Sequence, residues 1–376
     1  MNRFKIDKKL LKYLDIGIII VVILIVIFGT INIFSVTQPI AKNYMNYKAL
    51  KSQGVSFIIG IAIMYIIMTI DYTIIGAYAG LFYWASVFLL FINKVLDKLF
   101  NTAVFGQANW IQIGPVGFQP SEIAKLALII MLAKKLDDMD GKINNIKNFL
   151  IIMFYALVPV ALIFPDMGLT MIIFWTVLGI VFVAGLDFKV IFGGLAALVA
   201  SIGLIWNTNI INSNQKGRIT SFINPSADPL GASYQLIQSQ IAIGSGGLKG
   251  YGFMNGPRVG GGFVPFASTD FIFSVVCEEW GLFGAAFLFL LYAILIYKFI
   301  KIAKNSKDIF GSLMCVGIIS YFIYSIIQNA GMTIGIMPIS GITLPFMSYG
   351  GTSMMANFIA VGLILNVGMR RKKINF

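Results

Sequence analysis

Ten long apolar runs limit what this chain can fold into more than any other feature of its sequence. Most could cross a bilayer as an α-helix, which takes roughly 20 residues, and they are too long and too uniformly apolar for the alternating strands of a β-barrel. The sequence therefore predicts an all-α polytopic membrane protein of about ten transmembrane helices, near 14–34, 54–70, 72–92, 121–133, 148–164, 168–186, 190–206, 271–297, 310–334 and 352–369.

Composition supports this class and indicates one domain. Of the 376 residues, 58% are hydrophobic and only 11% are charged, whereas soluble proteins have roughly 25% charged residues. No soluble domain and no internal repeat interrupts the apolar runs, so we predict a single transmembrane domain over 1–376. Its largest connection is an extracytoplasmic loop of about 207–270, between the predicted helices at 190–206 and 271–297.

Basic residues predict the orientation of the chain. An even number of spans places both termini on one side, and the segments on that side hold about twice as many Lys and Arg as the other segments. Cytoplasmic segments of membrane proteins carry this excess. We therefore expect a multi-pass protein of the cytoplasmic membrane with both termini in the cytoplasm. The first apolar run lacks a small-residue cleavage site, so we interpret it as an uncleaved helix.

Several kinds of chemistry are excluded or disfavoured. The chain has no His, so proton transfer falls to carboxylates, Lys or Tyr. Its two cysteines, Cys277 and Cys315, lie in apolar runs and form neither a disulfide framework nor a metal-ligand pattern. The net charge of +13 fits a topology signal and an anionic target at the membrane better than nucleic acid.

Three segments predicted to lie outside the membrane carry the unusual content. Segment 93–120 holds Trp110 and most of the phrase GFQPSE. Segment 207–270 holds several Gln, Arg218 and a run of glycines, and segment 335–351 combines Gly and Pro with apolar residues. Irregular backbone is unstable against lipid and must pack on protein or line a cavity. Three such segments on one face indicate a roofed cavity that opens outward.

Asp270 is the candidate catalytic residue. It stands where a glycine-rich polar segment meets the apolar run that starts at Phe271, so its carboxylate is expected at the water interface. A half-desolvated carboxylate there suits a general base. Asp is also a preferred helix N-cap, and Thr269 precedes it, so capping of the helix at 271–297 is an alternative compatible with the first.

Charged residues elsewhere give further candidates, each with a structural alternative. Glu122 and Lys125 follow Gln119-Pro120-Ser121 at a helix start and share a helix face. They form a self-neutralising pair, or Lys125 helps to hold an anionic ligand, or the pair positions Asp270. Lys216, Arg218 and Arg258 are loop cations or a clamp on phosphate oxygens.

Other polar features carry weaker signals. The glycines at 244–247 form no nucleotide-binding motif and indicate a flexible loop or a backbone anion nest. Asp166 is expected to cap a helix, Glu278 and Glu279 to face the cavity or pair with a base such as Lys125, and Trp110 to be an interface anchor or a ligand platform.

Several phrases in a fixed order resemble one family. FQPSEIAKLALI (118–129), PDMG (165–168), DPLGASYQLIQSQIAIGSGGLKGYGF (228–253), TDFIFSVVCEEWG (269–281) and PISGITLPFMSYGGTS (338–353) are similar to the SEDS family of bacterial elongation, division and sporulation proteins. The short C-terminal tail and the INIFSVT phrase resemble its RodA branch. Ser268 and Asn109 depart from the family, which often has His and Arg at those positions.

The resemblance implies an inverting peptidoglycan glycosyltransferase that polymerises lipid II at the outer membrane face for elongation and cell shape. Its catalytic aspartate matches Asp270. It also implies a class B penicillin-binding protein as partner, lipid II and membrane lipids as ligands, no nucleic acid, and no certain cofactor beyond a possible divalent cation, Mg²⁺ or Mn²⁺. The substrate-binding residues we predict are Glu122, Lys125, Arg218, Trp110, Gln119, Ser121 and Gln238.

Other functions compete with polymerisation. A lipid II flippase also needs a cavity and buried charges, but its polar residues should follow a path across the whole membrane, whereas here they concentrate on the outer side. A scaffold that only recruits the transpeptidase is a third possibility, and a division or sporulation role within the family is a fourth.

Overall fold

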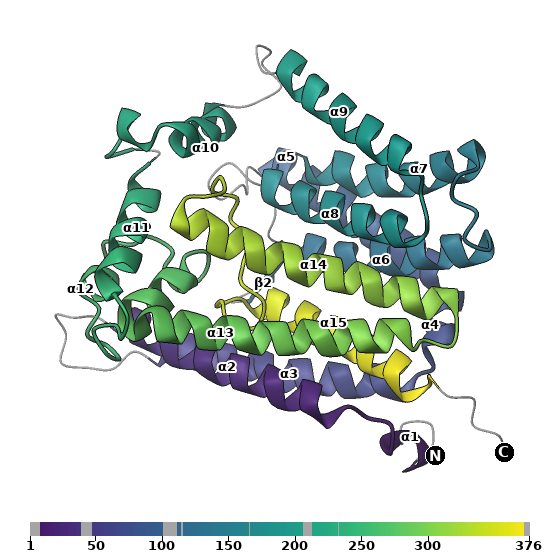
Figure 1. The fold of residues 1–376 in the computed structure, drawn as a ribbon, viewed down its shortest axis with the longest axis horizontal. Coiled ribbons are helices and arrows are strands. Elements are labelled where there is room, and N and C mark those ends of the chain that lie inside the picture. The colour runs from purple at the N-terminus through teal and green to yellow at the C-terminus, as the bar shows by residue number, and fades with distance from the viewer. Residues whose placement is uncertain are drawn as a thin grey trace.

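The computed structural model describes residues 8–38, 47–100, 111–113, 116–164, 166–205, 213–231 and 233–371. These residues form a bundle of long helices with a group of short helices at one end (Figure 1). The elements are α1 (Lys8–Leu11), α2 (Ile16–Thr37), α3 (Lys48–Thr69), α4 (Tyr72–Ala77), α5 (Ala79–Phe100), β1 (Ile111–Ile113), β2 (Val116–Phe118), α6 (Pro120–Asp138), α7 (Ile146–Ile163), α8 (Met167–Val183), α9 (Phe188–Ile205), α10 (Ser213–Ile223), the 3₁₀ helix η1 (Pro225–Ala227), α11 (Tyr234–Gly246), α12 (Pro257–Gly260), α13 (Ile272–Lys304), α14 (Ile309–Ile334) and α15 (Gly351–Met369).

A helix coincides with every predicted span, which confirms the all-α membrane class. Seven helices are by themselves long and apolar enough to cross a bilayer: α2, α3, α5, α7, α13, α14 and α15. The other three differ for local reasons, because α6 carries six charged residues, and α8 and the described apolar part of α9 are shorter. A count of ten crossings stays a prediction.

Short polar side chains begin several helices. Asp71 accepts a hydrogen bond from the Thr73 amide at 2.9 Å and starts α4, and Asp308 accepts one from the Gly311 amide at 2.7 Å and starts α14. Asp and Asn are preferred at this position because their oxygens satisfy amides that have no partner within the helix. The third predicted span is divided at Tyr78 into α4 and α5.

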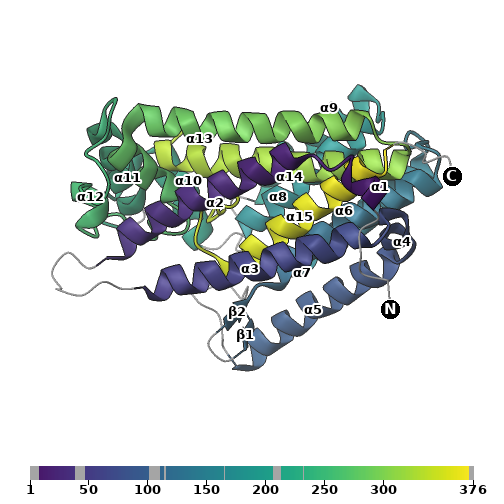
Figure 2. The ribbon, with the colours of Figure 1, turned by 90° about the horizontal axis from the view of Figure 1, so that it is seen from below.

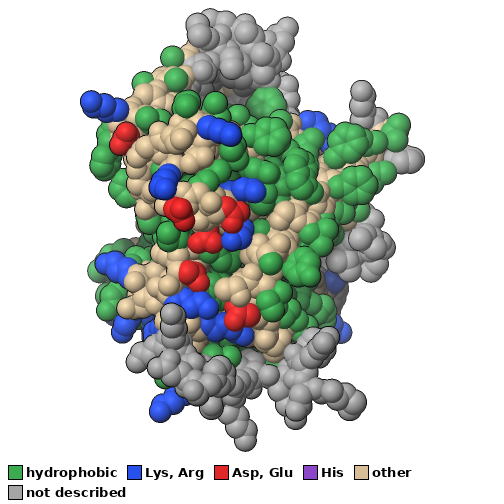
Figure 3. Space-filling model, turned by 90° about the vertical axis from the view of Figure 1, so that its right-hand side faces the viewer, with side chains coloured by type: hydrophobic (Ala, Val, Ile, Leu, Met, Phe, Trp, Pro, Cys, Tyr) green, Lys and Arg blue, Asp and Glu red, His purple; other side chains and the backbone are tan. Residues whose placement is uncertain are grey.

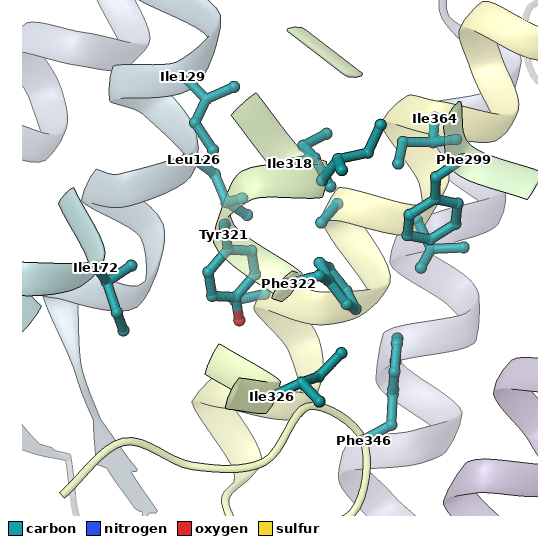
Figure 4. Packing of buried hydrophobic residues seen from close by; sticks show 14 of the residues in the cluster. Leu126, Ile129, Ile172, Phe299, Ile318, Tyr321, Phe322, Ile326, Phe346 and Ile364 are labelled. Atoms are coloured by element: carbon teal, nitrogen blue, oxygen red, sulfur yellow. The ribbon is translucent and has the colours of Figure 1, made fainter. Parts of the chain in front are cut away.

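The core lies where α6, α13, α14 and α15 meet. Leu126 and Ile129 of α6 face Ile318 and Tyr321 of α14 across this core (Figure 4). A methyl group on Gly317 would lie 2.7 Å from Ile129, so the two helices pack closely at this glycine. Helix α15 packs most extensively on α3, and Figure 2 shows it beside that helix.

The described part of the predicted extracytoplasmic loop is about half helical. It contains α10, η1, α11 and α12, which gather at the end of the bundle opposite the described chain ends (Figure 1). The expectation of a flexible glycine loop or an anion nest at 244–247 is therefore wrong. Gly244–Gly246 form the last turn of α11, and the carbonyl of Gly247 accepts a hydrogen bond from the Leu282 amide at 2.9 Å.

The predicted span 271–297 is interrupted. Within α13 the backbone leaves helical geometry at Gly281, where φ is 64° and ψ is −159°. Segment 247–252 satisfies the backbone groups that this break frees. Its Tyr251 and Gly252 amides donate to the carbonyls of Glu278 and Glu279 at 3.0 and 2.9 Å. A broken membrane helix is stable where protein groups replace its lost hydrogen bonds in this way.

Candidate active site

Asp270 lies immediately before α13 and is half-buried. The N-cap of α13 is Phe271, and no side chain makes a capping hydrogen bond there. The alternative in which Asp270 caps this helix is therefore wrong, because the chain turns one residue later than the capping pattern requires. The carboxyl group is left available for other interactions.

The backbone around Asp270 is fixed by the irregular segment that follows α14. Asn329 of α14 donates through Nδ2 to the carbonyl of Asp270 at 2.8 Å and to that of Ile342 at 2.7 Å. The Ser348 hydroxyl donates to the carbonyl of Thr269 at 2.6 Å. These bonds join the two segments, so the position of Asp270 depends on residues more than fifty positions away along the chain.

Burial raises the pKa of Asp270 to about 6. Burial acts because the charged carboxylate loses hydration. The Arg218 guanidinium and a hydrogen bond with the Thr269 side chain lower the pKa, and the negative charge of Asp166 raises it. An acid with a pKa near neutrality is suited to take a proton at physiological pH.

Asp166 is a residue whose role at this site was not apparent from the sequence. It caps α8 as predicted, since its Oδ1 accepts a hydrogen bond from the Leu169 amide at 3.0 Å. Its side chain is also buried and acts electrostatically on Asp270. The only sequence signal was the PDMG phrase, and a cap explains that phrase equally well.

Segment 338–350, which follows α14, contacts both the start of α8 and Asp270. A methyl group added to Gly168 would lie 3.3 Å from Ile342, and one added to Gly341 would lie 3.5 Å from Oδ2 of Asp270. Gly341 has a φ of 71°, a conformation that favours glycine. Segment 338–350 is thus packed on protein, as its composition predicted: Ile342, Leu344, Phe346 and Met347 are buried.

Glu278 and Glu279 are engaged in structural contacts. The Glu278 carboxylate accepts hydrogen bonds from the amides of Arg258 and Val259, both at 2.8 Å, and so holds the first turn of α12. Glu279 accepts a hydrogen bond from the Ser35 hydroxyl of α2. The expected pairing of these acids with Lys125 is wrong, because both belong to the part of α13 that packs on α2 and α12.

Arg258 and Gln238 form a second polar group on this end of the bundle. Arg258 donates through Nη1 to Oε1 of Gln238 at 3.3 Å, and its guanidinium carbon lies 5.5 Å from the centre of the Phe263 ring. Arg218 and Lys216 both lie on α10 and are half-buried. Cations thus lie on two of the short helices that follow α9.

Glu122 and Lys125 form a buried ion pair of 2.8 Å, with side chains only 6% and 4% exposed. The Lys125 ammonium also lies 4.0 Å from the centre of the Tyr321 ring, and the Tyr321 hydroxyl donates to Oδ1 of Asn357 at 2.5 Å. This geometry agrees with the alternative in which the charges of Glu122 and Lys125 neutralise each other. Tyr321 and Asn329 are both on α14, eight residues or roughly 12 Å apart along the axis.

Gln119 and Ser121, two further predicted site residues, lie at the start of α6. The Gln119 amide donates to the Thr352 hydroxyl of α15 at 3.3 Å. Ser121 is buried, and its hydroxyl has no hydrogen-bond partner among the described residues. Trp110 and Asn109 lie outside the described residues. Within the described part of the chain, no group of three or more Cys, Asp or Glu residues forms a candidate metal site.

Comparison with known proteins identifies the family of this chain. A model of the FtsW/RodA/SpoVE family, described as "Cell cycle protein", matches residues 16–373. The chain belongs to this family. FtsW/RodA/SpoVE membership confirms the resemblance that the ordered sequence phrases indicated.

Relatives within the FtsW/RodA/SpoVE family include named enzymes. The chain is 34% identical over 360 residues to stage V sporulation protein E of Bacillus subtilis, covering 94% of this chain and 96% of that protein. It is 33% identical over 318 residues to peptidoglycan glycosyltransferase MrdB of Escherichia coli, covering 84% of each chain.

Solved structures of the family share the fold. One match belongs to a structure described as "Structural coordination of polymerization and crosslinking by a peptidoglycan synthase complex", with a TM-score of 0.80, 30% identity, and coverage of 96% of this chain and 99% of that chain. The rod shape determining protein RodA of Thermus thermophilus matches with a TM-score of 0.71, 26% identity, and coverage of 96% and 98%.

Proposed function

We propose that this chain is an inverting peptidoglycan glycosyltransferase that polymerises lipid II at the outer face of the cytoplasmic membrane, with Asp270 as general base. The observation that carries the proposal is the state of the Asp270 carboxyl group. It is half-buried, makes no helix cap, has a pKa raised to about 6 and is subject to the positive charge of Arg218. Family membership and the name of the MrdB relative support the reaction class.

The reaction requires a base because a sugar hydroxyl is a poor nucleophile until it loses its proton. Asp270 takes that proton while the hydroxyl oxygen forms a bond to the anomeric carbon of the donor. The bond between this carbon and the lipid pyrophosphate breaks, and the pyrophosphate leaves with the electron pair. Direct displacement inverts the anomeric centre, so an α-linked donor gives a β-linked polymer. General base catalysis contributes roughly 10²–10⁴-fold to the rate.

The remaining acceleration requires stabilisation of the leaving pyrophosphate. We assign this role to Arg218. Its charge already acts on Asp270, and a guanidinium can bind two phosphate oxygens at once. Arg258 lies on the same end of the bundle. Glu122 and Lys125 neutralise each other and position Tyr321 in this scheme, while Gln119, Ser121, Gln238 and Trp110 stay candidates for binding the sugar and peptide.

We propose an orientation of the chain in the membrane from its basic residues. The end of the bundle opposite α11 and α12 shows Lys and Arg side chains around a group of acidic ones (Figure 3). Close to the two described chain ends, Lys298 pairs with Asp15 at 2.8 Å and Arg370 with Asp71 at 3.3 Å. An excess of basic residues favours the cytoplasmic side, so both chain ends are cytoplasmic and Asp270 faces outward.

The biological role we propose is cell elongation and shape, together with a class B penicillin-binding protein as transpeptidase partner. The RodA-like phrases and the fold shared with RodA support the elongation role. The related synthase complex combines polymerisation and crosslinking, which supports a crosslinking partner. Complementation of strains that lack the elongation, division or sporulation member separates the three roles.

The proposed function is tested with purified protein and lipid II, with and without the transpeptidase and divalent ions. Glycan strands in the product would support it. Translocation of labelled lipid II across vesicles without any polymer would instead indicate a flippase, and recruitment of the transpeptidase without either activity would indicate a scaffold.

The pH dependence of polymerisation should shift in opposite directions in two variants. Asp270 acts as a base only when deprotonated, so activity falls as pH drops through about 6. Asp166→Asn removes a charge that raises the pKa of Asp270, so the fall in activity on the acid side of the pH profile (the acid limb) should move to lower pH. Arg218→Gln removes a charge that lowers this pKa, so the limb should move to higher pH.

Initial rates between pH 5 and 8 at saturating lipid II measure this shift. Asp166→Asn is a conservative choice, because an Asn side chain can still accept the hydrogen bond from the Leu169 amide and cap α8. Limbs that move in the same direction in both variants would contradict the assignment of Asp270 as the titrating base.

A further inference from the structure

A groove between α6 and α7 lies far from Asp270 and has no part in the proposed reaction. It has a volume of about 480 Å³ and is lined by Lys135 of α6 and by Lys147, Leu150, Ile151, Phe154 and Tyr155 of α7. Both lysines belong to the end of the bundle where the described chain ends lie (Figure 1). The groove is therefore distinct from the outward-facing site.

The residues of α7 in this groove share one face of the helix. Lys147 is followed at spacings of three, four, seven and eight by Leu150, Ile151, Phe154 and Tyr155, which is the spacing of a single helical stripe. Leu150 and Phe154 are 58% and 53% exposed, so the stripe faces outward from the bundle. A stripe that begins with a cation and continues as apolar side chains matches a lipid with a charged headgroup and an acyl chain.

The floor of the groove is held in place. The Tyr83 hydroxyl of α5 donates to the carbonyl of Tyr155 at 2.8 Å, and the two rings pack edge to face at 5.3 Å. The Lys135 ammonium lies 5.8 Å from the centre of the Tyr155 ring. Tyr155 stands eight residues, or roughly 12 Å, along α7 from Lys147, so the groove extends over about two turns of this helix.

The charge of the groove is uncompensated. Neighbouring Lys134 pairs with Asp137 and Asp138 at 3.0 and 2.8 Å, and Lys142 with Asp140 at 4.0 Å. Among the described residues, no carboxylate lies within ion-pair distance of Lys135 or Lys147. A cation beside apolar, lipid-facing residues is stabilised by an anionic partner.

We infer that this groove binds an anionic phospholipid, with its phosphate between Lys135 and Lys147 and an acyl chain along Leu150, Ile151 and Phe154. Basic pockets between transmembrane helices on the cytoplasmic side are suited to anionic headgroups. The lipid itself is identified by charge complementarity with the two cations. The assignment of this lipid to the inner leaflet rests on the proposed orientation of the chain. The inference that the groove binds the lipid does not.

Native mass spectrometry of the purified protein tests this inference, with phosphatidylglycerol and phosphatidylcholine of identical acyl chains as probes. The unchanged protein should prefer phosphatidylglycerol. Lys135→Gln and Lys147→Gln should each weaken phosphatidylglycerol binding about fivefold, since a cation near a lipid surface contributes roughly 1 kcal/mol. Both variants should weaken phosphatidylcholine binding less, because its choline offsets the charge of the phosphate. Lys142→Gln is the matched control, because Lys142 is nearby and 77% exposed but outside the groove, and it should bind like the unchanged protein.

Three results would overturn the inference. They are equal binding of the two lipids by the unchanged protein, an equal loss in Lys142→Gln, and displacement of the lipid by millimolar glycerol phosphate, which would indicate a headgroup site without an acyl-chain groove. The assay needs no turnover, so Asp270→Asn should bind phosphatidylglycerol normally. Failure of the lipid inference and failure of the proposed enzyme activity are therefore separate results.

Discussion

Asp270→Asn should reduce lipid II polymerisation by roughly 10²–10⁴-fold, the usual contribution of a general base. The amide has nearly the shape of the carboxylate but cannot take the proton of the sugar hydroxyl. The backbone carbonyl of residue 270, which accepts the 2.8 Å hydrogen bond from Asn329, is unaffected by the change. Binding of lipid II and of the transpeptidase should therefore persist while the chemical step is lost.

Single-turnover polymerisation and lipid II binding, measured on the same preparation, separate these effects. Asp140→Asn is a matched control: it also neutralises one acid, its side chain is 85% exposed, and Asn tolerates the positive φ of 51° at that position. The control should polymerise normally. Full polymer output from Asp270→Asn would exclude Asp270 as the base.

Gly281→Ala should strongly destabilise the protein. Its φ of 64° and ψ of −159° lie in a region that is essentially restricted to glycine, and such strain costs about 1–3 kcal/mol. The added methyl group would also lie 2.5 Å from the Gly250 amide nitrogen and 2.6 Å from the Leu248 carbonyl oxygen. Both contacts are with backbone that cannot rotate away, so overpacking adds roughly another 1–3 kcal/mol.

Gly244→Ala is the matched control for this substitution. Gly244 lies within α11, on the segment that leads into the same contact, and a methyl group there meets nothing within 4 Å. Because alanine favours helix over glycine, the control should be unchanged or more stable by up to about 1 kcal/mol. Thermal unfolding in one detergent compares both variants with the unchanged protein. Equal melting temperatures would show that the break at Gly281 does not depend on glycine.

The helical framework was predictable because a long apolar run in a membrane is stable as a helix, which satisfies its own backbone hydrogen bonds. A helix stands at each predicted span, and the bounds differ by a few residues at most ends. The larger differences arise from tertiary contacts. The third span divides at Tyr78, and α13 breaks at Gly281, where segment 247–252 supplies hydrogen bonds from a distant part of the chain.

The site was predictable only in part. Asp270 could be singled out because a lone acid at the start of an apolar run is costly unless it has a use. Its electrostatic neighbours could not, because Asp166 and Arg218 come from segments far apart in sequence. Glu278 shows the opposite case. It lies near Asp270 in sequence and was expected to face the same cavity or to pair with a base, but its carboxylate binds the amides of α12.

The sequence by itself determined the membrane class, the position of the helices and the family, and it singled out Asp270 as the candidate base, because these follow from local composition and ordered phrases. Only the tertiary structure decided which charges act on that acid, where α13 breaks, and that Lys135 and Lys147 share one groove. Those properties depend on distances between residues that are remote along the chain, and distance sets both electrostatic interaction and hydrogen bonding.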